Sequence, residues 1–223
     1  MGRDITLIAS DNFELGAYRA DPAATPKAAV VVIQEIFGVN HHIRAVCDRF
    51  AAQGYVAVAP AIFDRSERNF QSGYSADEVA VARKFVANPD WNAMLLDTQA
   101  AIDSVKDTGP VGIIGFCLGG SVAYAAATRL SGLSAAVGYY GGAIVRFADD
   151  KPKVPTQLHF GEKDAGIPLT DVETVRAKRP DVEIFIYPGA QHGFHCDERP
   201  SYNKASSDVA WPRSLAFFAK HLK

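Results

Sequence analysis

Three side chains that could together carry out nucleophilic catalysis occur in an informative order along this sequence. Residues 115–119 read Gly-Phe-Cys-Leu-Gly, the pattern G-x-S-x-G with a cysteine, Cys117, in the position of the serine. Asp164 and His192 follow further along the chain. The order nucleophile, acid, histidine is typical of enzymes that hold the nucleophile on a sharp turn between a strand and a helix. The order therefore predicts acyl transfer by the sulfur of Cys117.

The spacing of the glycines in residues 115–119, which we call the elbow, has a steric explanation. Glycines two positions before and after the nucleophile remove side chains that would collide in a tight strand-to-helix turn. The helix that starts after the elbow adds a positive dipole end, which favours a thiolate, and a free backbone N–H at Leu118 for an oxyanion. The alternative is a glycine-rich turn with a buried, unreactive cysteine.

His192 is the predicted base and Asp164 the predicted orienting acid. Each follows a predicted strand, so both fall in loops at the sheet edge where such sites form. Asp164 would accept the proton on Nδ1 of His192, which leaves Nε2 to face the sulfur. His195 is the alternative base, but Gly193 favours His192 because glycine permits a tight loop. Glu162 is the alternative acid, from the same turn as Asp164.

Apolar segments of two periods alternate along the chain, which is typical of α/β proteins. Short apolar runs predict six strands buried on both faces of a parallel sheet, at residues 28–33, 55–59, 111–114, 135–139, 157–160 and 182–187. Helices are expected at residues 40–53, 76–106 with a break at Pro89, 118–130, 169–178 and 206–221. Residues 5–19 predict an antiparallel edge hairpin. We therefore expect one domain, residues 1–223, with a mostly parallel central sheet and helices on both faces.

The composition argues against several other classes of protein. The 223 residues are 48% hydrophobic and 22% charged, which suits one large core. The formal net charge is −2, without blocks of one sign, so neither nucleic acid nor a membrane is an expected partner. The chain has no apolar run that predicts a signal or membrane-spanning segment, and its three widely spaced cysteines fit neither a disulfide framework nor a CxxC metal site. We expect a soluble, cytoplasmic protein with reduced thiols.

Four segments resemble one known protein family. They are residues 34–40 (Gln-Glu-Ile-Phe-Gly-Val-Asn), 115–120 (the elbow and one further glycine), 138–141 (Gly-Tyr-Tyr-Gly) and 190–194 (Ala-Gln-His-Gly-Phe). Together they are similar to the dienelactone hydrolases, or carboxymethylenebutenolidases, of the α/β-hydrolase superfamily. The resemblance implies the α/β-hydrolase fold. It also implies a triad and an oxyanion hole of two backbone N–H groups, formed respectively by Cys117, Asp164 and His192 and by Ile36 and Leu118.

The resemblance also gives Glu35 a role. In that family the glutamate of the Gln-Glu-Ile-Phe-Gly segment approaches the resting cysteine and swings away when substrate binds. A nearby carboxylate opposes a second negative charge and can hold the thiol proton, so the thiolate forms only when it is needed. A permanent thiolate would be prone to oxidation. The alternative is a solvated loop glutamate at the end of a strand.

The family pattern for substrate binding is only partly matched. In the best-known members an arginine four residues after the catalytic histidine helps to hold a substrate carboxylate, and here this position is Cys196. A second arginine, expected early in the helix that starts at residue 76, would fall near Val79, and Arg83 follows one turn later. Arg199 is either a replacement guanidinium or a surface arginine. The candidate substrate-binding residues are Phe37, Arg83, Tyr140, Arg199 and Tyr202.

These observations predict hydrolysis of a small ester or enol lactone through a thioester on Cys117, without a cofactor or metal. An enol lactone suits a thiolate nucleophile because its leaving group is a stabilised enolate. One alternative is a general carboxylesterase or thioesterase for neutral esters, which the missing arginines support. Another is a non-catalytic domain that binds ligands or senses oxidants through Cys117. We expect a small-molecule substrate and a monomer or weak homodimer.

Overall fold

Eight strands form one sheet at the centre of the structure, a computed structural model that describes residues 2–223. In chain order they are β1 (Arg3–Ile8), β2 (Glu14–Ala20), β3 (Ala28–Ile33), β4 (Tyr55–Pro60), β5 (Val111–Phe116), β6 (Leu133–Tyr139), β7 (Thr156–Gly161) and β8 (Glu183–Tyr187). Their order across the sheet is β1-β2-β4-β3-β5-β6-β7-β8. Strands β3 to β8 are parallel, whereas β1 and β2 form an antiparallel hairpin beside β4. This arrangement confirms the predicted fold class.

The central strands form because their residues are apolar and buried on both faces. Every residue of β3, β4 and β5 is buried, so alternate side chains pack against helices on opposite sides of the sheet. Burying one valine or isoleucine side chain contributes about 1.5–3 kcal/mol, which makes these strands the main apolar core. β1, at the edge, is mostly exposed. Asn12 turns the hairpin with φ 66°, a left-handed conformation that asparagine tolerates better than most residues.

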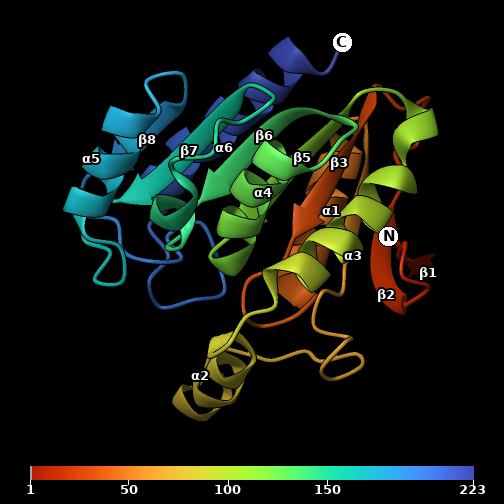
Figure 1. Ribbon diagram of the computed structural model, residues 1–223, viewed down its shortest axis with the longest axis horizontal. Helices are drawn as coiled ribbons and strands as arrows, with labels where there is room; N and C mark the ends of the chain where they lie inside the picture. Colours follow the sequence, from red (N-terminus) through yellow and green to blue (C-terminus); the bar gives the residue numbers. More distant parts are fainter. Residues whose placement is uncertain (1) are drawn as a thin grey trace.

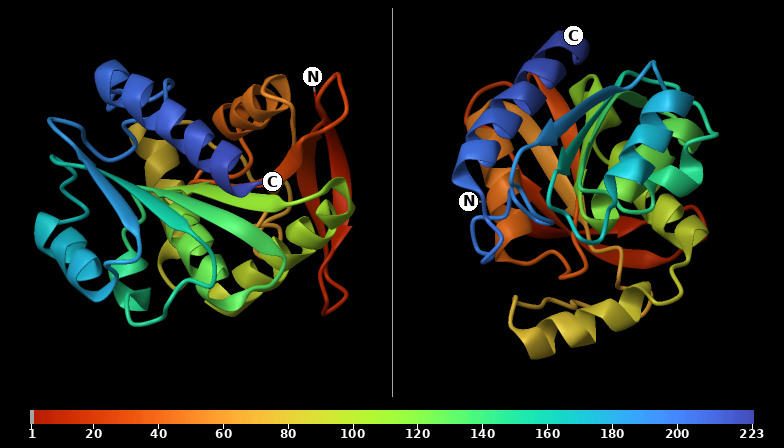
Figure 2. Two further views of the ribbon diagram at one scale, coloured as in Figure 1. Left: turned by 90° about the horizontal axis from the view of Figure 1, so that it is seen from above. Right: turned by 90° about the vertical axis from the view of Figure 1, so that its left-hand side faces the viewer.

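Helices cover both faces of the sheet (Figures 1 and 2). α1 (His41–Ala52) and α6 (Lys204–His221) lie on one face, and α3 (Trp91–Asp103), α4 (Leu118–Arg129) and α5 (Leu169–Lys178) lie on the other. Asn40 caps α1, since its side chain accepts a hydrogen bond from the backbone N–H of Ile43. Within residues 2–223, no helix combines the length and the apolar character needed to cross a bilayer.

A loosely packed arm, residues 76–86, stands apart from the sheet in Figures 1 and 2. It consists of α2 (Ala76–Ala82) and the 3-10 helix η1 (Arg83–Val86). α2 is stabilised locally by a capping box between Ser75 and Glu78, and Ala82 is its one buried residue. The predicted helix at 76–106 is therefore interrupted more widely than expected, because α2 ends at Ala82 and α3 begins only at Trp91.

Candidate active site

Cys117 lies on a strained turn between β5 and α4. Its φ of 56° and ψ of −117° are values that residues other than glycine rarely adopt. The turn is possible because two glycines leave space. A Cβ on Gly115 would lie 1.9 Å from the carbonyl oxygen of Gly119, and a Cβ on Gly119 would lie 2.3 Å from that of Ile33. Strain of about 1–3 kcal/mol is typical of such positions, and here it holds the sulfur at the N-terminus of a helix, where an anion is favoured.

His192 and Asp164 form a hydrogen-bonded pair. Nδ1 of His192 is 2.7 Å from Oδ2 of Asp164, whose carboxylate is fully buried. Oδ1 of Asp164 accepts a hydrogen bond from the backbone N–H of Gly166 at 2.9 Å, which fixes the carboxylate. Burial opposes a charged imidazole, but the charge of Cys117 and hydrogen bonds to Asp164 and Cys117 outweigh it and raise the pKa of His192 to about 10. This geometry therefore favours a protonated His192 beside the sulfur of Cys117, which can carry a negative charge.

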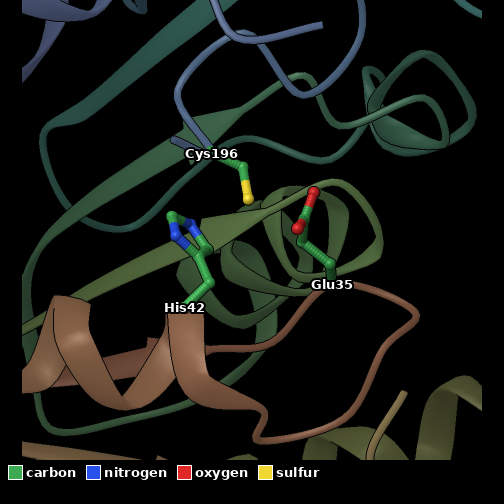
Figure 3. Close-up of side chains that lie close together, drawn as sticks. All are labelled: Glu35, His42 and Cys196. Atoms are coloured by element: carbon green, nitrogen blue, oxygen red, sulfur yellow. The ribbon is translucent and has the colours of Figure 1, made fainter. Parts of the chain in front are cut away.

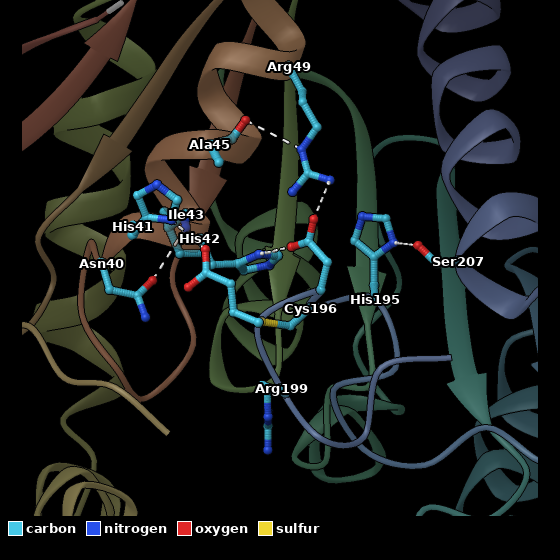
Figure 4. Close-up of polar contacts among 12 residues, drawn as sticks. Asn40, His41, His42, Ile43, Ala45, Arg49, His195, Cys196, Arg199 and Ser207 are labelled. Carbon is cyan, nitrogen blue, oxygen red and sulfur yellow. Dashed lines mark hydrogen bonds and ion pairs between the residues drawn. The ribbon is translucent and has the colours of Figure 1, made fainter. Parts of the chain in front are cut away.

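The alternative base and the alternative acid are engaged elsewhere. Nδ1 of His195 lies 2.8 Å from the hydroxyl of Ser207, as Figure 4 shows, and burial lowers the pKa of His195 well below its ordinary value. Oε2 of Glu162 accepts a hydrogen bond from the backbone N–H of Gly189 at 2.9 Å. The geometry therefore favours His192 over His195 and Asp164 over Glu162.

Cys117 and His192 border a cleft with two lobes. The first lobe, of about 330 Å³, extends towards α3 and α5 and is lined by Trp91, Arg146 and Ile167. We call it the Trp91 lobe. Its walls are mainly apolar, and Arg146 supplies a positive charge at its rim.

The second lobe, of about 500 Å³, extends from Cys117 towards the arm. We call it the Arg83 lobe. Its walls include Phe37, Arg83, Lys163 and Arg199, so it is more positively charged than the Trp91 lobe. Three predicted substrate-binding residues, Phe37, Arg83 and Arg199, thus lie in one lobe beside the predicted nucleophile.

Ile36 and Leu118, the predicted oxyanion donors, line the cleft that Cys117 borders. Leu118 is the first residue of α4, where N–H groups have no partner within the helix. Ile36 lies in the turn after β3 and lines both lobes, and its N–H makes no hydrogen bond within residues 2–223. Unpaired N–H groups at this position suit the oxyanion of an acyl-transfer intermediate.

Glu35 is buried and forms an ion pair with Arg199. Its Oε1 accepts a hydrogen bond from Nη1 of Arg199 at 2.9 Å, and the two side chains are 1% and 18% exposed. Gly193 makes room for this pair, because a Cβ there would lie 2.5 Å from Nη1 of Arg199. Burial opposes the charge of Arg199, but the negative groups around it, with Glu35 foremost, raise its pKa above the ordinary value. Glu35 is thus not a solvated loop residue, and Arg199 is not an ordinary surface arginine.

Known proteins match this chain over nearly its whole length. The model of the dienelactone hydrolase family matches residues 15–222. A Synechocystis protein with the name "Putative carboxymethylenebutenolidase" is 36% identical over 239 residues, which cover 98% of this chain and 97% of the relative. The chain belongs to the dienelactone hydrolase family.

Further relatives of the chain agree with it in sequence and structure. An Escherichia coli protein, also named "Putative carboxymethylenebutenolidase", is 34% identical over 236 residues, covering 97% of this chain and 86% of the relative. The crystal structure of a "Putative Dienelactone Hydrolase" from Klebsiella pneumoniae superposes with a TM-score of 0.87 at 31% identity, covering 99% of this chain and 100% of the other. Family membership makes the chain a hydrolase with the α/β-hydrolase fold.

Two other predicted substrate-binding residues are not among the residues that line the cleft. Tyr140 is fully buried with φ 39°, its ring centroid is 5.1 Å from that of His192, and its hydroxyl has no hydrogen-bond partner. It therefore packs against the predicted base. Tyr202 is half-buried, and its backbone N–H donates to the carbonyl oxygen of Arg199 at 3.0 Å. This hydrogen bond helps to hold the backbone of the loop that carries Arg199.

The residues of the Trp91 lobe were not predicted from the sequence. Trp91 opens α3, and Arg146 belongs to the 3-10 helix η3 (Ile144–Phe147). The one available signal was that η3 follows β6 and the Gly-Tyr-Tyr-Gly segment, at the sheet edge that carries the elbow. Neither its side-chain direction nor its distance from Cys117 follows from spacing alone.

The other two cysteines have surroundings unlike those of Cys117. Cys47 is fully buried in α1, and burial raises the pKa of its thiol. Cys196 is also buried, with Sγ 3.3 Å from the hydroxyl of Tyr74, and burial together with the charge of Glu35 raises its pKa to about 12. Both side chains are therefore neutral thiols near pH 7.

Proposed function

We propose that this protein hydrolyses small carboxylic esters and enol lactones, with Cys117 as nucleophile, His192 as base and Asp164 as the group that orients His192. One observation carries the proposal. The sulfur stands on a strained elbow at a helix N-terminus and borders the same cleft as a histidine that is hydrogen bonded to a buried aspartate. Relatives named as carboxymethylenebutenolidases support the substrate class.

In the acylation step, the thiolate of Cys117 attacks the carbonyl carbon of the ester, and the π electrons of the carbonyl move onto its oxygen. The N–H groups of Ile36 and Leu118 stabilise this oxyanion. When the tetrahedral intermediate collapses, the bond from carbon to the leaving oxygen breaks, and the imidazolium of His192 protonates that oxygen. A thioester on Cys117 and a neutral His192 remain.

In the deacylation step, His192 removes a proton from water as the water oxygen attacks the thioester carbon. The second intermediate collapses by expelling the thiolate of Cys117, and the acid product leaves. His192 is again an imidazolium, which Asp164 stabilises in both half-reactions. Because the thiolate is itself easily expelled, productive acylation requires a good leaving group, and the enolate of an enol lactone meets that requirement.

Glu35 completes the proposal as a gate for the sulfur. In the structure Arg199 binds its Oε1, while Oε2 has no hydrogen-bond partner. Rotation of the carboxylate towards Cys117 would let it accept a hydrogen bond from the thiol, so that the proton stays on sulfur before substrate arrives. When the carboxylate returns to Arg199, that proton passes to His192 and leaves a thiolate beside an imidazolium. The two positions give the carboxylate a partner in each state.

Trapping the acyl-enzyme tests the nucleophile. After rapid mixing with an activated aryl ester and acid quenching, we expect a burst of leaving group and a mass increase of one acyl group on the peptide that contains Cys117. The Cys117→Ala variant should show neither. An adduct on another residue, or a burst that persists in this variant, would contradict the assignment.

A comparison of substrates tests the specificity. Arg83, Lys163 and Arg199 line one lobe, which favours a substrate with a carboxylate. We therefore expect kcat/KM for a dienelactone that carries a carboxylate to exceed that for a neutral aryl ester of similar size and leaving group. The opposite preference would support the general carboxylesterase alternative instead.

A further inference from the structure

Three buried side chains from distant parts of the chain converge behind the cleft. Glu35 follows β3, His42 lies in the first turn of α1, and Cys196 lies in the loop after His192. Figure 3 shows them facing one common space. A carboxylate oxygen, a ring nitrogen and the sulfur all lie within 4.8 Å of one another. We call these three residues the buried cluster.

The buried cluster is short of hydrogen bonds. His42 is 0% exposed, and among residues 2–223 neither of its ring nitrogens has a hydrogen-bond partner. Oε2 of Glu35, which is 1% exposed, has none among these residues either. A buried polar atom without a partner costs about 1–3 kcal/mol, so most such atoms in folded proteins are paired. A carboxylate oxygen of Glu35 and one ring nitrogen of His42 lie near the same sulfur, an arrangement that suits a bound cation.

The atoms that face this space form a ligand set for a transition metal. Thiolate, imidazole and carboxylate together suit Zn²⁺, which binds sulfur at about 2.3 Å and nitrogen or oxygen at about 2.0–2.2 Å, usually in a tetrahedron. The three donor atoms lie within 4.8 Å of one another. Donors bound to one tetrahedral Zn²⁺ stand about 3.3–3.7 Å apart, so metal binding would draw the three side chains together. The Cys196 thiol would lose its proton to solvent on binding, and the thiolate and the Glu35 carboxylate would then balance the two charges of the metal.

The surroundings supply the outer partners that such a site needs. Oδ1 of Asp197 lies 3.4 Å from Nδ1 of His42, where it can orient the ring so that Nε2 faces the metal. Arg199 bonds Oε1 of Glu35, which leaves Oε2 available. Figure 4 shows His42, Cys196 and Arg199 in one region.

Two more exposed carboxylates lie beside the buried cluster. Carboxylate oxygens of Asp197 and Glu198 lie within 4.8 Å of a ring nitrogen of His42 and of each other, and both side chains are partly exposed. His42 is therefore shared by two groups of possible ligands, the buried cluster and a more exposed group with Asp197 and Glu198. An incoming cation could exchange water for these carboxylates before it reaches the buried sulfur.

We propose that Glu35, His42 and Cys196 form a Zn²⁺ site behind the active-site cleft, with a water or Tyr74 hydroxyl oxygen as fourth ligand. A metal bound there would hold the Glu35 carboxylate away from Cys117. The site shares Glu35 with the proposed gate but includes no residue of the proposed triad, and its test does not require turnover.

Cobalt substitution tests the site in the full-length, reduced protein. Co²⁺ bound by a thiolate in a tetrahedral site gives near-ultraviolet charge-transfer absorption and visible ligand-field bands. We use Cys117→Ala as the background, because it removes the other sulfur that lies beside a histidine. One equivalent of Co²⁺ should produce both sets of bands, and Zn²⁺ should abolish them by displacement.

Variants of the buried cluster provide the controls. Adding Cys196→Ser to the Cys117→Ala background should remove the charge-transfer band, and adding His42→Gln should weaken Co²⁺ binding by more than about 10-fold, since loss of an outer partner alone costs about 10–100-fold. Cys47→Ala should keep the band. If the serine variant fails to fold, zinc X-ray absorption on the Cys117→Ala protein still reports whether one sulfur and lighter atoms surround the metal. The proposal would be overturned if X-ray absorption shows no sulfur bound to zinc. It would also be overturned if Co²⁺ gives no bands with the Cys117→Ala protein, or if the charge-transfer band survives Cys196→Ser.

Discussion

Two groups made of the same residue types, a cysteine, a histidine and a carboxylate, lie close to each other in this molecule. In the group at the cleft, Asp164 is hydrogen bonded to His192, and Cys117 raises the pKa of His192. In the buried cluster, His42 has no hydrogen-bond partner, and burial lowers its pKa. Residue type alone therefore does not determine chemistry. Hydrogen bonding beside a cleft suits the cleft group to the proposed proton transfer, whereas burial and unpaired atoms suit the buried cluster to the proposed metal.

The largest effect should come from removing the proposed nucleophile. Cys117→Ala should lower kcat/KM for an activated ester by about 10⁶-fold, as loss of a triad nucleophile does in other enzymes. Steady-state kinetics measure this, with Cys47→Ala as a control in the core. If the variant keeps activity within a factor of ten of the wild type, Cys117 is not the nucleophile and the cleft group has no catalytic role that separates it from the buried cluster.

The next largest effect should come from the orienting carboxylate. Asp164→Asn should lower kcat by about 10⁴-fold, because the amide would hold the wrong tautomer of His192. Glu162→Gln is the matched control in the same turn, where the glutamate bonds the backbone of Gly189. Similar losses for both variants would mean that the turn as a whole, rather than Asp164, matters.

The pKa of His192 should depend on its sulfur neighbour. The imidazole should stay protonated up to about pH 10 in the wild type, and in Cys117→Ala its pKa should fall towards the ordinary 6.5 because the charge of Cys117 is gone. NMR of ¹⁵N-labelled histidine measures both values. A pKa that is raised on folding stabilises the protein fully below pH 6.5, and this contribution is lost as the pH rises through about 10.

The corresponding stability measurement uses urea unfolding between pH 6 and 11. The difference in unfolding free energy between wild type and Cys117→Ala should decrease across the window from 6.5 to 10. A constant difference would mean that His192 and Cys117 are not coupled.

Alkylation should separate the cysteines without any mutation. At neutral pH, iodoacetamide should label Cys117 at least about 100-fold faster than Cys196 or Cys47, because reactive cysteines are accessible and lie in electropositive surroundings. Peptide mass spectrometry at timed intervals gives the three rates. Comparable labelling of Cys196 in the folded protein would show that the buried cluster is open to solvent.

The smallest effects should come from the two lobes. Arg83→Ala should raise KM for a substrate with a carboxylate by about 10-fold or more, since a hydrogen bond to a charged group contributes about 1.5–3 kcal/mol. Arg146→Ala should have a smaller effect, because Arg146 is a single cation in its lobe, whereas Arg83 shares its lobe with Lys163 and Arg199. A larger effect at Arg146 would place the carboxylate in the Trp91 lobe.

Much of the fold could be predicted because a buried parallel strand has a direct sequence signature. The run at residues 28–33 coincides with β3, and the helix expected at 169–178 coincides with α5. The interruption at 83–90 was predicted only at Pro89. The earlier end of α2 reflects its weak packing against the rest of the molecule, and helix propensity does not report packing.

The candidate triad could be proposed from order and spacing, but its neighbours could not. His41 and His42 were expected to open one helix face. In the structure His41 is exposed, whereas His42, one residue further along α1, points to the interior and is fully buried. Glu35, His42 and Cys196 come together only because the loop after β3, the start of α1 and the loop after His192 fold against one another. No periodicity in the sequence encodes how those segments come together.

The elbow has a consequence for how the enzyme could change. Its shape depends on the hydrogen atoms that Gly115 and Gly119 carry in place of side chains, and the sulfur itself takes no part in that close packing. The proposed reacting atom can therefore be exchanged while the backbone beneath it stays the same. Replacing sulfur with oxygen at this one position would alter which leaving groups the enzyme tolerates without a new scaffold, so nucleophile and architecture can evolve separately.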